Sequence, residues 1–396
     1  MRILITDYYA ASNRGDAAIL DGLIHSIKTK IPSAEFEVIT ENTTAAELLH
    51  DINVNEQMIS VQQWKEYWKQ GEFPKSVDNM VINLYKNADL IISTGGHHIT
   101  EDYFPGKIGM LMELYYCSRL AAPVALVGQT IGPVKNIIYR KLVKTVLNRV
   151  DLITVRDQKS LSVVKSLGIT TPTKFTADAA FSMPTVPLST PKISSRRVQD
   201  ELSIKKETST LVTISPREVR SFYNTSVERN YIECLAHVAD NIIRKGDYYV
   251  VFVPTCTSLA GYSTDDRIIS HRIVDQMDEE GARIIMAELS HYEIYSVYNQ
   301  ADLHIGTRMH SCILAAKSGT PLVALEYQYK LSELMSQLSV EEYGLAVDTL
   351  TSERLNDVIN NVIGNSNKIS KKIKKSAGKI QNESMKNGDL VKILTE

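Results

Sequence analysis

Long hydrophobic runs are absent from this 396-residue sequence, and no stretch approaches the roughly 18 apolar residues that a membrane-spanning helix needs. The first ten residues, MRILITDYYA, carry one basic side chain and a short apolar core, which predicts a β-strand and not a signal peptide. We therefore expect a cytoplasmic protein that meets any membrane-bound substrate at the inner face of the membrane.

Cysteine is scarce and a surplus of charge is lacking. The four cysteines form no CxxC pair, which indicates reduced, mostly buried thiols and argues against a zinc site. A formal net charge of -2 gives no overall positive field for nucleic acid, so any anion must be bound locally. No GxGxxG fingerprint follows the first apolar run, which argues against a dinucleotide site.

The sequence does contain a repeated alternation of apolar strands and amphipathic helices, which is typical of parallel sheets. The first series of expected strands covers residues 2–6, 36–39, 90–93, 124–127 and 152–155. After a stretch rich in Pro, Ser and Thr the alternation resumes. The second series of expected strands covers residues 211–215, 249–254, 283–287, 302–305 and 321–325.

The length favours two domains, because one hydrophobic core rarely covers so many residues. We predict an N-terminal α/β domain at 1–183, a linker at 184–207, a C-terminal α/β domain at 208–350 and a helical, lysine-rich tail at 351–396. The expected fold class is α/β, with two doubly wound Rossmann-like domains facing a cleft.

The most informative segment is residues 301–330, which predict a strand, a helix from Arg308 and a second strand. Thr307 is the expected N-cap, and Arg308 and His310 lie in the first helical turn. Lys330 follows the second strand. Cationic side chains beside the unpaired N–H groups of a helix N-terminus predict a site for a phosphorylated or carboxylated small molecule.

Loops of the first half also follow strands. The loop NRGD at 13–16 places a glycine where backbone can approach a ligand. Asp16 is either a helix N-cap or a carboxylate that acts as a base or orients a sugar hydroxyl. The loop GQTIGP at 128–133 holds the same kind of position after a later strand. In the loop STGGHH, the two histidines suggest a metal site, but the sequence nearby offers no third ligand. We therefore expect substrate contacts from Gly95, Gly96, His97 and His98.

Two further arginines lie at the ends of expected strands. A buried Arg156 needs a partner, and the candidates are the adjacent Asp157 and an anionic ligand. Arg217 is either a cation of the binding site or part of a surface ion pair.

Two segments have a structural and a binding interpretation. The tail at 366–380 predicts an amphipathic basic helix, which either packs back on the protein or attaches weakly to anionic lipid. Trp64, Tyr67 and Trp68 share one helix face, which either packs into the first domain or stacks on a sugar.

In chain order, the motifs NRGD, STGG, GQTIGP, VRD, ADAA, TRMH and EYQYK resemble the polysaccharide pyruvyl transferase family from residue 1 to about 345. The resemblance implies a fold similar to GT-B glycosyltransferases. It also implies transfer of pyruvate from phosphoenolpyruvate to a sugar of a cell-surface polysaccharide or its lipid-linked precursor, commonly as a ketal. Met309 stands where the family more often has Leu, a departure that we take as neutral.

The resemblance maps important family residues onto Asp16, Arg156, His310 and Lys330. The first three are the expected catalytic residues, with His310 as acid and Asp16 as base. The C-terminal domain is the expected donor side, where the phosphate and carboxylate of phosphoenolpyruvate call for cations and N–H donors. The expected donor-binding residues are Thr307, Arg308, Lys330 and Arg217, and those of the acceptor loops in the N-terminal domain are Asn13, Gly95, Gly96, His97 and His98.

A nucleotide-sugar glycosyltransferase of the same fold is the alternative. Retaining members often carry two glutamates eight positions apart in this region, whereas Glu326 and Glu333 are seven apart. A non-catalytic sugar-binding protein is a further alternative, which the retained motif residues disfavour. The expected partners are phosphoenolpyruvate as co-substrate and a saccharide or lipid-linked acceptor, with peripheral membrane contact left open; no cofactor, metal or nucleic acid is expected.

Overall fold

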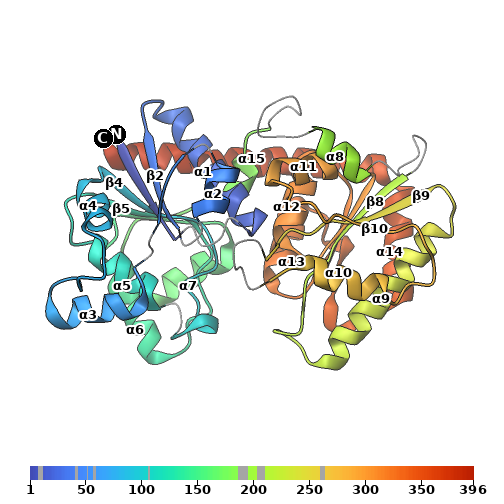
Figure 1. The fold of residues 1–396 in the computed structure, drawn as a ribbon, viewed down its shortest axis with the longest axis horizontal. Helices are drawn as coiled ribbons and strands as arrows, with labels where there is room; N and C mark the ends of the chain where they lie inside the picture. Colours follow the sequence, from blue (N-terminus) through green and yellow to red (C-terminus); the bar gives the residue numbers. More distant parts are fainter. Residues whose placement is uncertain are drawn as a thin grey trace. The chain divides into compact units, whose positions relative to one another are not determined.

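The computed structural model describes residues 1–7, 12–40, 43–50, 52–56, 59–105, 108–185, 195–202, 210–258 and 264–396 (Figure 1). The chain forms two compact units. Unit 1 comprises Met1–Ala11, Asp16–Pro184 and Gln381–Glu396, and unit 2 comprises Ser12–Gly15 and Thr185–Ile380. Neither unit follows the predicted boundaries. Residues 12–15 belong to unit 2 although the residues on both sides of them belong to unit 1, and the last 16 residues belong to unit 1.

Unit 1 is built on a seven-stranded parallel sheet with the order β3-β2-β1-β4-β5-β6-β7. The middle strands are apolar throughout because helices cover both faces of the sheet. The short outer strands β3 and β7 escaped prediction because their sequences, NVNE and TKF, are largely polar. The strands are β1 (Arg2–Thr6), β2 (Glu35–Thr40), β3 (Asn53–Glu56), β4 (Leu90–Ser93), β5 (Val124–Gln129), β6 (Leu152–Val155) and β7 (Thr173–Phe175).

The helices of unit 1 form layers on the two sides of this sheet (Figure 1). One side buries a core of Leu4, Ile91, Leu126 and Ile153 against helix side chains such as Trp64, which confirms the packing interpretation for that tryptophan. The helices are α1 (Arg14–Lys30), α2 (Thr43–Leu49), α3 (Val61–Gln70), α4 (Asn79–Asn87), α5 (Ile108–Cys117), α6 (Ile137–Leu147) and α7 (Gln158–Leu167), with short 3-10 turns at Glu101–Tyr103 and Ala179–Ser182.

Unit 2 contains a six-stranded parallel sheet with the order β10-β9-β8-β11-β12-β13. Numbered within the unit, this is the Rossmann order 3-2-1-4-5-6. Its strands are β8 (Thr210–Ser215), β9 (Tyr248–Phe252), β10 (Arg283–Ile284), β11 (Leu303–Gly306), β12 (Leu322–Glu326) and β13 (Gly344–Ala346). Its helices are α8 (Ser195–Leu202), α9 (Thr225–Ile243), α10 (Asp266–Val274), α11 (His291–Asn299), α12 (Met309–Ser318), α13 (Tyr329–Leu338) and α14 (Ser352–Gly364), with 3-10 turns at Glu341–Tyr343 and Val347–Thr349.

The predicted linker at 184–207 contains helix α8, so it is not irregular throughout. Val198 and Leu202 are buried, and Glu201 forms an ion pair with Arg283 at 3.2 Å. These contacts supply the helix with a packed face that the polar sequence did not suggest. The linker residues 186–194 and 203–207 lie outside the described part of the chain.

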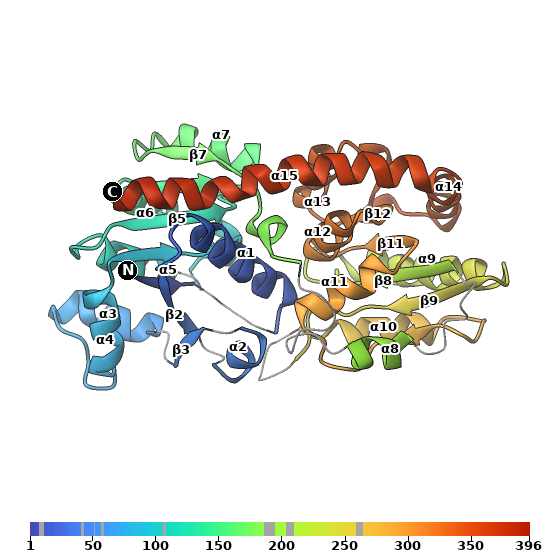
Figure 2. The ribbon, with the colours of Figure 1, turned by 90° about the horizontal axis from the view of Figure 1, so that it is seen from above.

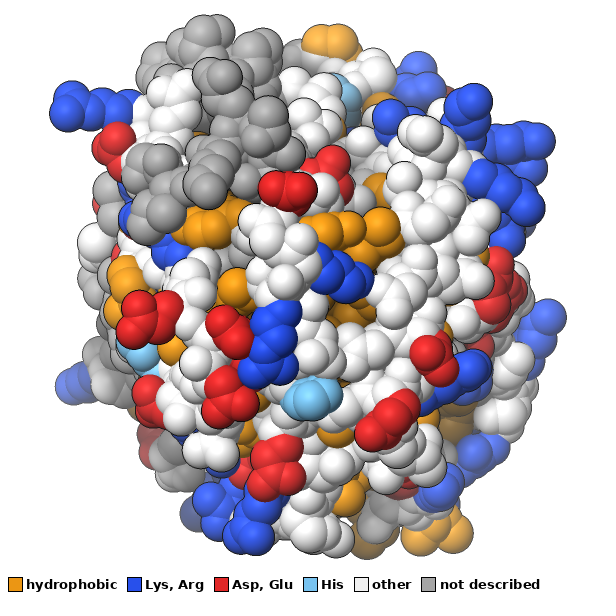
Figure 3. Space-filling view, turned by 90° about the vertical axis from the view of Figure 1, so that its right-hand side faces the viewer, with side chains coloured by type: hydrophobic (Ala, Val, Ile, Leu, Met, Phe, Trp, Pro, Cys, Tyr) orange, Lys and Arg blue, Asp and Glu red, His pale blue; other side chains and the backbone are white. Residues whose placement is uncertain are grey.

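The tail forms the 30-residue helix α15 (Ser366–Thr395), which is continuous in Figure 2. Its first half buries Ile369, Ile373, Ala377 and Ile380 in unit 2, which confirms that the apolar stripe packs back on the protein. Its second half buries Ser384 and Asn387 completely in unit 1. The lysines of the first half point to solvent. Figure 3 views unit 2, where basic and acidic side chains are interspersed over the centre of the face.

In the part of the chain that the structure describes, no helix combines the length and apolar character that crossing a membrane requires.

Candidate functional site

The loops that follow β8 and β11 lie at the topological switch point of unit 2. The two strands are neighbours and parallel, with Ser215 paired to Gly306 at their carboxyl ends. From this point the chain leads outward in opposite directions, to β9 on one side and to β12 on the other. Doubly wound sheets bind ligands at such a point. Arg217, Thr307 and Arg308 all follow these two strands.

Arg308 is held in an ion pair with a buried carboxylate. Its Nε and Nη2 atoms donate to Asp266 at 2.5–3.2 Å. Asp266 is inaccessible to solvent and Arg308 is 13% exposed. Burial opposes the charge of Arg308, but the Asp266 carboxylate more than offsets it and raises the pKa of the guanidinium. Asp266 also accepts from the backbone N–H groups of Thr255 and Cys256, which fixes the arginine to the end of β9.

Arg308 and not Thr307 is the N-cap of α12, which corrects the predicted helix start. Its φ and ψ of -86° and 124° are extended, and its side chain makes no capping hydrogen bond. The Thr307 hydroxyl is instead 2.7 Å from the hydroxyl of the buried Tyr231. Thr307 is thereby unavailable to the helix N–H groups.

A buried histidine sets the first turn of α12. The single proton of the Ser311 hydroxyl goes to the Arg308 carbonyl at 2.7 Å, so the Nε2 of His304, 3.0 Å away, must be the donor to Ser311. The Nδ1 of His304 then accepts from Thr213. Burial lowers the pKa of His304 to about 3, so the ring is neutral and keeps this tautomer.

Arg217 is stacked on aromatic rings and not bound to a carboxylate. Its guanidinium lies 4.1 Å from the ring centre of Tyr327 and 4.9 Å from that of Phe222. Its Nε donates to the Glu218 carbonyl, and among the described residues it has no ion-pair partner. The surface salt bridge considered for Arg217 is therefore absent from the described structure. The backbone N–H of Arg217 donates to the Tyr231 hydroxyl, which links it to Thr307.

Two adjacent helices of unit 2 begin without a side-chain cap. These are α12, after β11, and α13, after β12. By contrast α9, α10, α11 and α14 each begin with a capping side chain. His310 lies in the first turn of α12 and Lys330 in the first turn of α13. The positive ends of both helix dipoles suit an anion with more than one acidic group.

The segment Ser12–Gly15 is anchored at this same edge of unit 2. Arg14 is 1% exposed and bonds to the Glu288 carboxylate at 2.8 Å and to the Leu289 carbonyl at 2.6 Å. Asn13 forms a β-bridge with Cys256. A Cβ on Gly15 would lie 2.3 Å from Nδ1 of His310, so glycine is required for the loop to meet the imidazole. The structure thus brings Asn13 and His310 into one neighbourhood.

Asp16 is the next residue, and it lies in unit 1. Helix α1 begins at Arg14, which places Asp16 in the first turn and excludes the N-cap interpretation. The Oδ1 of Asn13 accepts from the N–H of Gly15, as a capping side chain does. Residues 8–11, which precede this segment, lie outside the described part of the chain.

Asp7 is a carboxylate at the switch point of unit 1 that sequence reasoning missed. It follows β1 with a left-handed φ of 61° and accepts from Ser93 Oγ at 2.6 Å at the end of neighbouring β4. Aspartate is among the non-glycine residues that adopt this conformation, and here it brings the carboxylate to the switch point beside Ser93. Nearby Gln129 donates to Ser93 Oγ and the Thr94 carbonyl. The signal available in the sequence was an aspartate directly after the first buried strand.

Arg156 is paired within unit 1 with a residue other than the adjacent Asp157. Its Nη1 binds Asp178 at 2.6 Å and its Nε donates to Thr130. The adjacent Asp157 instead caps α7 and accepts from Thr130. The motif ADAA supplies the partner. Arg156 follows β6, and Asp178 follows the neighbouring parallel strand β7. Ser384 of α15 donates to the Asp178 carbonyl, so the tail supports this pair.

The loop STGGHH packs against the loop GQTIGP. A Cβ on Gly95 would lie 2.8 Å from the Gly128 carbonyl oxygen. His97 donates from Nε2 to the Gly132 carbonyl at 2.6 Å and is buried. Gly96 accepts from the N–H of Thr130, and a Cβ there would meet the ring of His98. These contacts account for both glycines by close packing, while substrate contact by His97 and His98 stays a prediction.

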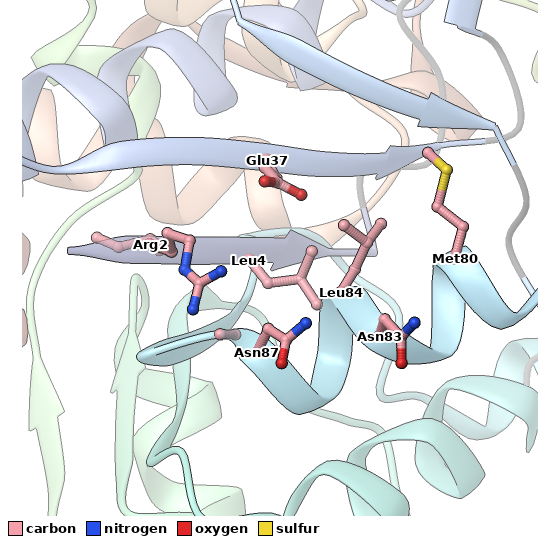
Figure 4. A pocket seen from close by; sticks show the side chains of 9 residues that line it. Arg2, Leu4, Glu37, Met80, Asn83, Leu84 and Asn87 are labelled. Carbon is pink, nitrogen blue, oxygen red and sulfur yellow. The ribbon is translucent and has the colours of Figure 1, made fainter.

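Two cavities of the described chain lie away from these residues. One of about 340 Å³ in unit 1 is lined by side chains of β1, β2 and α4, among them Arg2, Glu37, Asn83 and Asn87 (Figure 4). Another of about 400 Å³ in unit 2 lies between α9 and α10. None of the predicted site residues lines either cavity.

Comparison with known proteins gives a family and a fold. The family model described as polysaccharide pyruvyl transferase matches residues 13–329. A relative, the amylovoran biosynthesis protein AmsJ of Erwinia amylovora, is 26% identical over 94% of both chains.

Similar solved structures share the fold at low sequence identity. A UDP-N-acetylglucosamine 2-epimerase from Neisseria meningitidis matches with a TM-score of 0.65 at 12% identity, covering 100% of this chain and 99% of its own. Anabaena HepE matches with a TM-score of 0.61 at 15% identity, covering 99% and 98%. They confirm two Rossmann-like domains of the GT-B kind.

Proposed function

The chain belongs to the polysaccharide pyruvyl transferase family, and we propose that it transfers pyruvate from phosphoenolpyruvate to a sugar of a cell-surface polysaccharide or its lipid-linked precursor. The relative named for amylovoran biosynthesis supports polysaccharide as the acceptor class. The proposed product is a pyruvyl ketal, and the second product is inorganic phosphate.

The observation that carries the donor assignment is Arg217. A guanidinium at the switch point of a doubly wound sheet, stacked on Tyr327 and Phe222 and without a described carboxylate partner, has donors left for an anionic ligand. The starts of α12 and α13, which have no side-chain cap, bring the positive ends of two helix dipoles to the same edge. Phosphoenolpyruvate carries two acidic groups, which suits two such helix starts.

In the proposed reaction a proton is added to the methylene carbon of phosphoenolpyruvate and a sugar hydroxyl attacks the adjacent carbon. The carbon–oxygen bond to phosphate then breaks, and a second hydroxyl of the sugar attacks the same carbon and loses its proton. The two sugar hydroxyls lose two protons in all. One of these balances the proton added to the methylene carbon, and the released phosphate takes up the other. We assign His310 as the acid that protonates the methylene carbon and Asp16 as the base that receives a hydroxyl proton. Arg308 is the cation whose position the Asp266 pair fixes.

The test is the shift in melting temperature that phosphoenolpyruvate produces. A ligand present at about 100 times its Kd stabilises by about 2.7 kcal/mol, which a melting curve detects readily. We expect wild-type protein to be stabilised and Arg217→Ala to lose the shift. Arg220→Ala is the matched control, because Arg220 is an exposed arginine of the same loop. His310→Ala should keep the shift and lose phosphate release in the presence of acceptor.

Nucleotide sugars are run beside phosphoenolpyruvate. Stabilisation by UDP-glucose or another nucleotide sugar, with none by phosphoenolpyruvate, would assign the chain to glycosyl transfer and refute the proposal. A full shift in Arg217→Ala would refute only the role of that arginine.

A further inference from the structure

The outer surface of helices α3, α5 and α6 in unit 1, named the α3–α5–α6 surface, is basic although the chain as a whole carries a net charge of -2. Residues 134–150 contain Lys135, Arg140, Lys141, Lys144 and Arg149 and no acidic residue. Lys65, Lys69 and Arg119 add to them from α3 and the end of α5. The acidic residues nearby are Glu66, Glu72 and Glu101, whose carboxylate accepts from the backbone N–H groups of Lys135 and Asn136. None of these eight cations has an ion-pair partner among the described residues.

The same surface exposes large apolar side chains. Ile137 and Ile138 are each 69% exposed, more than any other large hydrophobic residue of the described chain. Ile137, Lys141 and Lys144 follow at i, i+4 and i+7, so they share one stripe of α6. The opposite side of α6 buries Tyr139, Val143, Val146 and Leu147. Packing within unit 1 therefore leaves the isoleucines without an apolar partner.

Half-buried aromatic rings join the three helices. The rings of Trp68 on α3 and Tyr115 on α5 lie 5.0 Å apart. The guanidinium of Arg149, just after α6, lies 4.8 Å from the centre of Tyr115. Arg119 lies 5.7 Å from the centre of Trp68. Amphipathic aromatic rings beside lysine and arginine are the side chains that settle at the headgroup level of a bilayer.

We propose that the α3–α5–α6 surface docks on the face of an anionic lipid bilayer. The eight cations supply attraction to anionic headgroups, and the exposed isoleucines enter the boundary between headgroups and acyl chains. A soluble polyanion would engage the charges and leave Ile137 and Ile138 in water, so a bilayer accounts for both features. This docking adds one partner to the proposed function, namely the membrane that carries a lipid-linked acceptor. The identification of that membrane rests on the proposed function.

The first half of α15 is a second basic segment, and it lacks the exposed large apolar side chains. Its apolar stripe of Ile369, Ile373, Ala377 and Ile380 is already buried in unit 2. Lys372 is also paired with Glu342 at 3.2 Å. The first half of α15 therefore offers charge without apolar contact, which provides a matched control surface.

The experiment is co-sedimentation of the full chain with vesicles of phosphatidylcholine alone or mixed with phosphatidylglycerol, in the absence of phosphoenolpyruvate and acceptor. We expect binding only to the mixed vesicles, weakened by salt. Lys141→Glu/Lys144→Glu should lower the partition coefficient by about tenfold or more. Lys371→Glu/Lys375→Glu on α15 should bind as wild type does. Ile137→Ser/Ile138→Ser should weaken vesicle binding and leave binding to heparin, a soluble polyanion, unchanged.

Three results would overturn the proposal: no binding of wild type to the mixed vesicles, equal loss in both lysine pairs, or an unaltered partition coefficient in the isoleucine variant. Circular dichroism and melting curves show whether each variant is folded, and substitutions at these exposed positions should change stability little. Because no substrate is present, failure of vesicle binding leaves the proposed pyruvyl transfer untouched. Failure of the phosphoenolpyruvate shift leaves vesicle binding equally untouched.

Discussion

At the scale of single residues, Glu113 carries an unusual protonation equilibrium. It is buried in unit 1 and accepts from the Tyr85 hydroxyl at 2.5 Å. Burial, and then the charge of Asp7, raise the pKa of Glu113 from its ordinary 4.5 to about 8. At neutral pH the folded protein therefore holds a proton here that the unfolded chain releases.

This difference predicts that stability falls as pH rises from about 4.5 to about 8 and then levels off, since within that window the folded state binds more protons. The upper limit is about 1.4 kcal/mol for each pH unit. Glu113→Gln cannot ionise, so its melting temperature relative to wild type should rise between pH 5 and pH 9. Glu66→Gln at the surface of α3 is the control. Melting profiles of Glu113→Gln and wild type that stay parallel across this range would contradict the prediction.

Several residues of the site were accessible from the sequence and others were not. Arg308 and His310 were recognised because strand, turn and helix follow one another in a single short segment. Asp266 was missed because it lies 42 positions away, and only the parallel pairing of β8 with β9 and β11 brings it to Arg308. Ser384 and Asn387 were missed because they read as ordinary polar residues of a solvated helix.

At the scale of elements, the start of α12 depends on the pair of Arg308 and Asp266. Removing one member of a buried pair leaves an uncompensated charge, which costs about 3–5 kcal/mol. We expect Asp266→Asn to lower the free energy of unfolding by this amount and to abolish the shift by phosphoenolpyruvate. Asp275 is exposed at the other end of α10, the helix that Asp266 begins. Asp275→Asn should change the free energy of unfolding by no more than about 0.5 kcal/mol. Denaturation in urea measures both variants.

A double variant separates stability from ligand binding. Asp266→Leu/Arg308→Met replaces the pair with apolar side chains and should recover most of the lost stability. It should not recover the shift, because the cation is gone. Recovery of both would show that Arg308 has no part in donor binding.

Helices and strands were predicted most accurately where the apolar pattern was long. The buried strands β4 and β6 were located at their observed bounds, because uninterrupted apolar character marks them. The edge strands β3, β7 and β13 have only three or four residues, which is too short for a pattern of apolar residues to be recognised. They form because a neighbouring strand offers backbone hydrogen bonds, which is information outside their own sequence.

At the scale of the whole molecule, α15 completes unit 1 from the far end of the chain. The buried Asn387 accepts from Thr154 Oγ1 at 2.8 Å, and Thr154 Oγ1 accepts from the N–H of Gly128. We expect Asn387→Ala to destabilise unit 1 by about 1–2 kcal/mol, because the Thr154 hydroxyl loses its acceptor in a buried place. Asn382→Ala, exposed on the same helix, should have no measurable effect. Thermal unfolding of the two variants decides between them.

The split of unit 1 over both ends of the sequence has a consequence for biosynthesis. A ribosome completes the seven strands of unit 1 first, then makes residues 185–380, and only afterwards makes residues 381–396. At about 5–20 residues per second, the intervening stretch takes roughly 10–40 seconds. During that interval the nascent first unit presents to water the groups that Ser384 and Asn387 later cover. The core of unit 1 is therefore completed only after residues 185–380 have been synthesised.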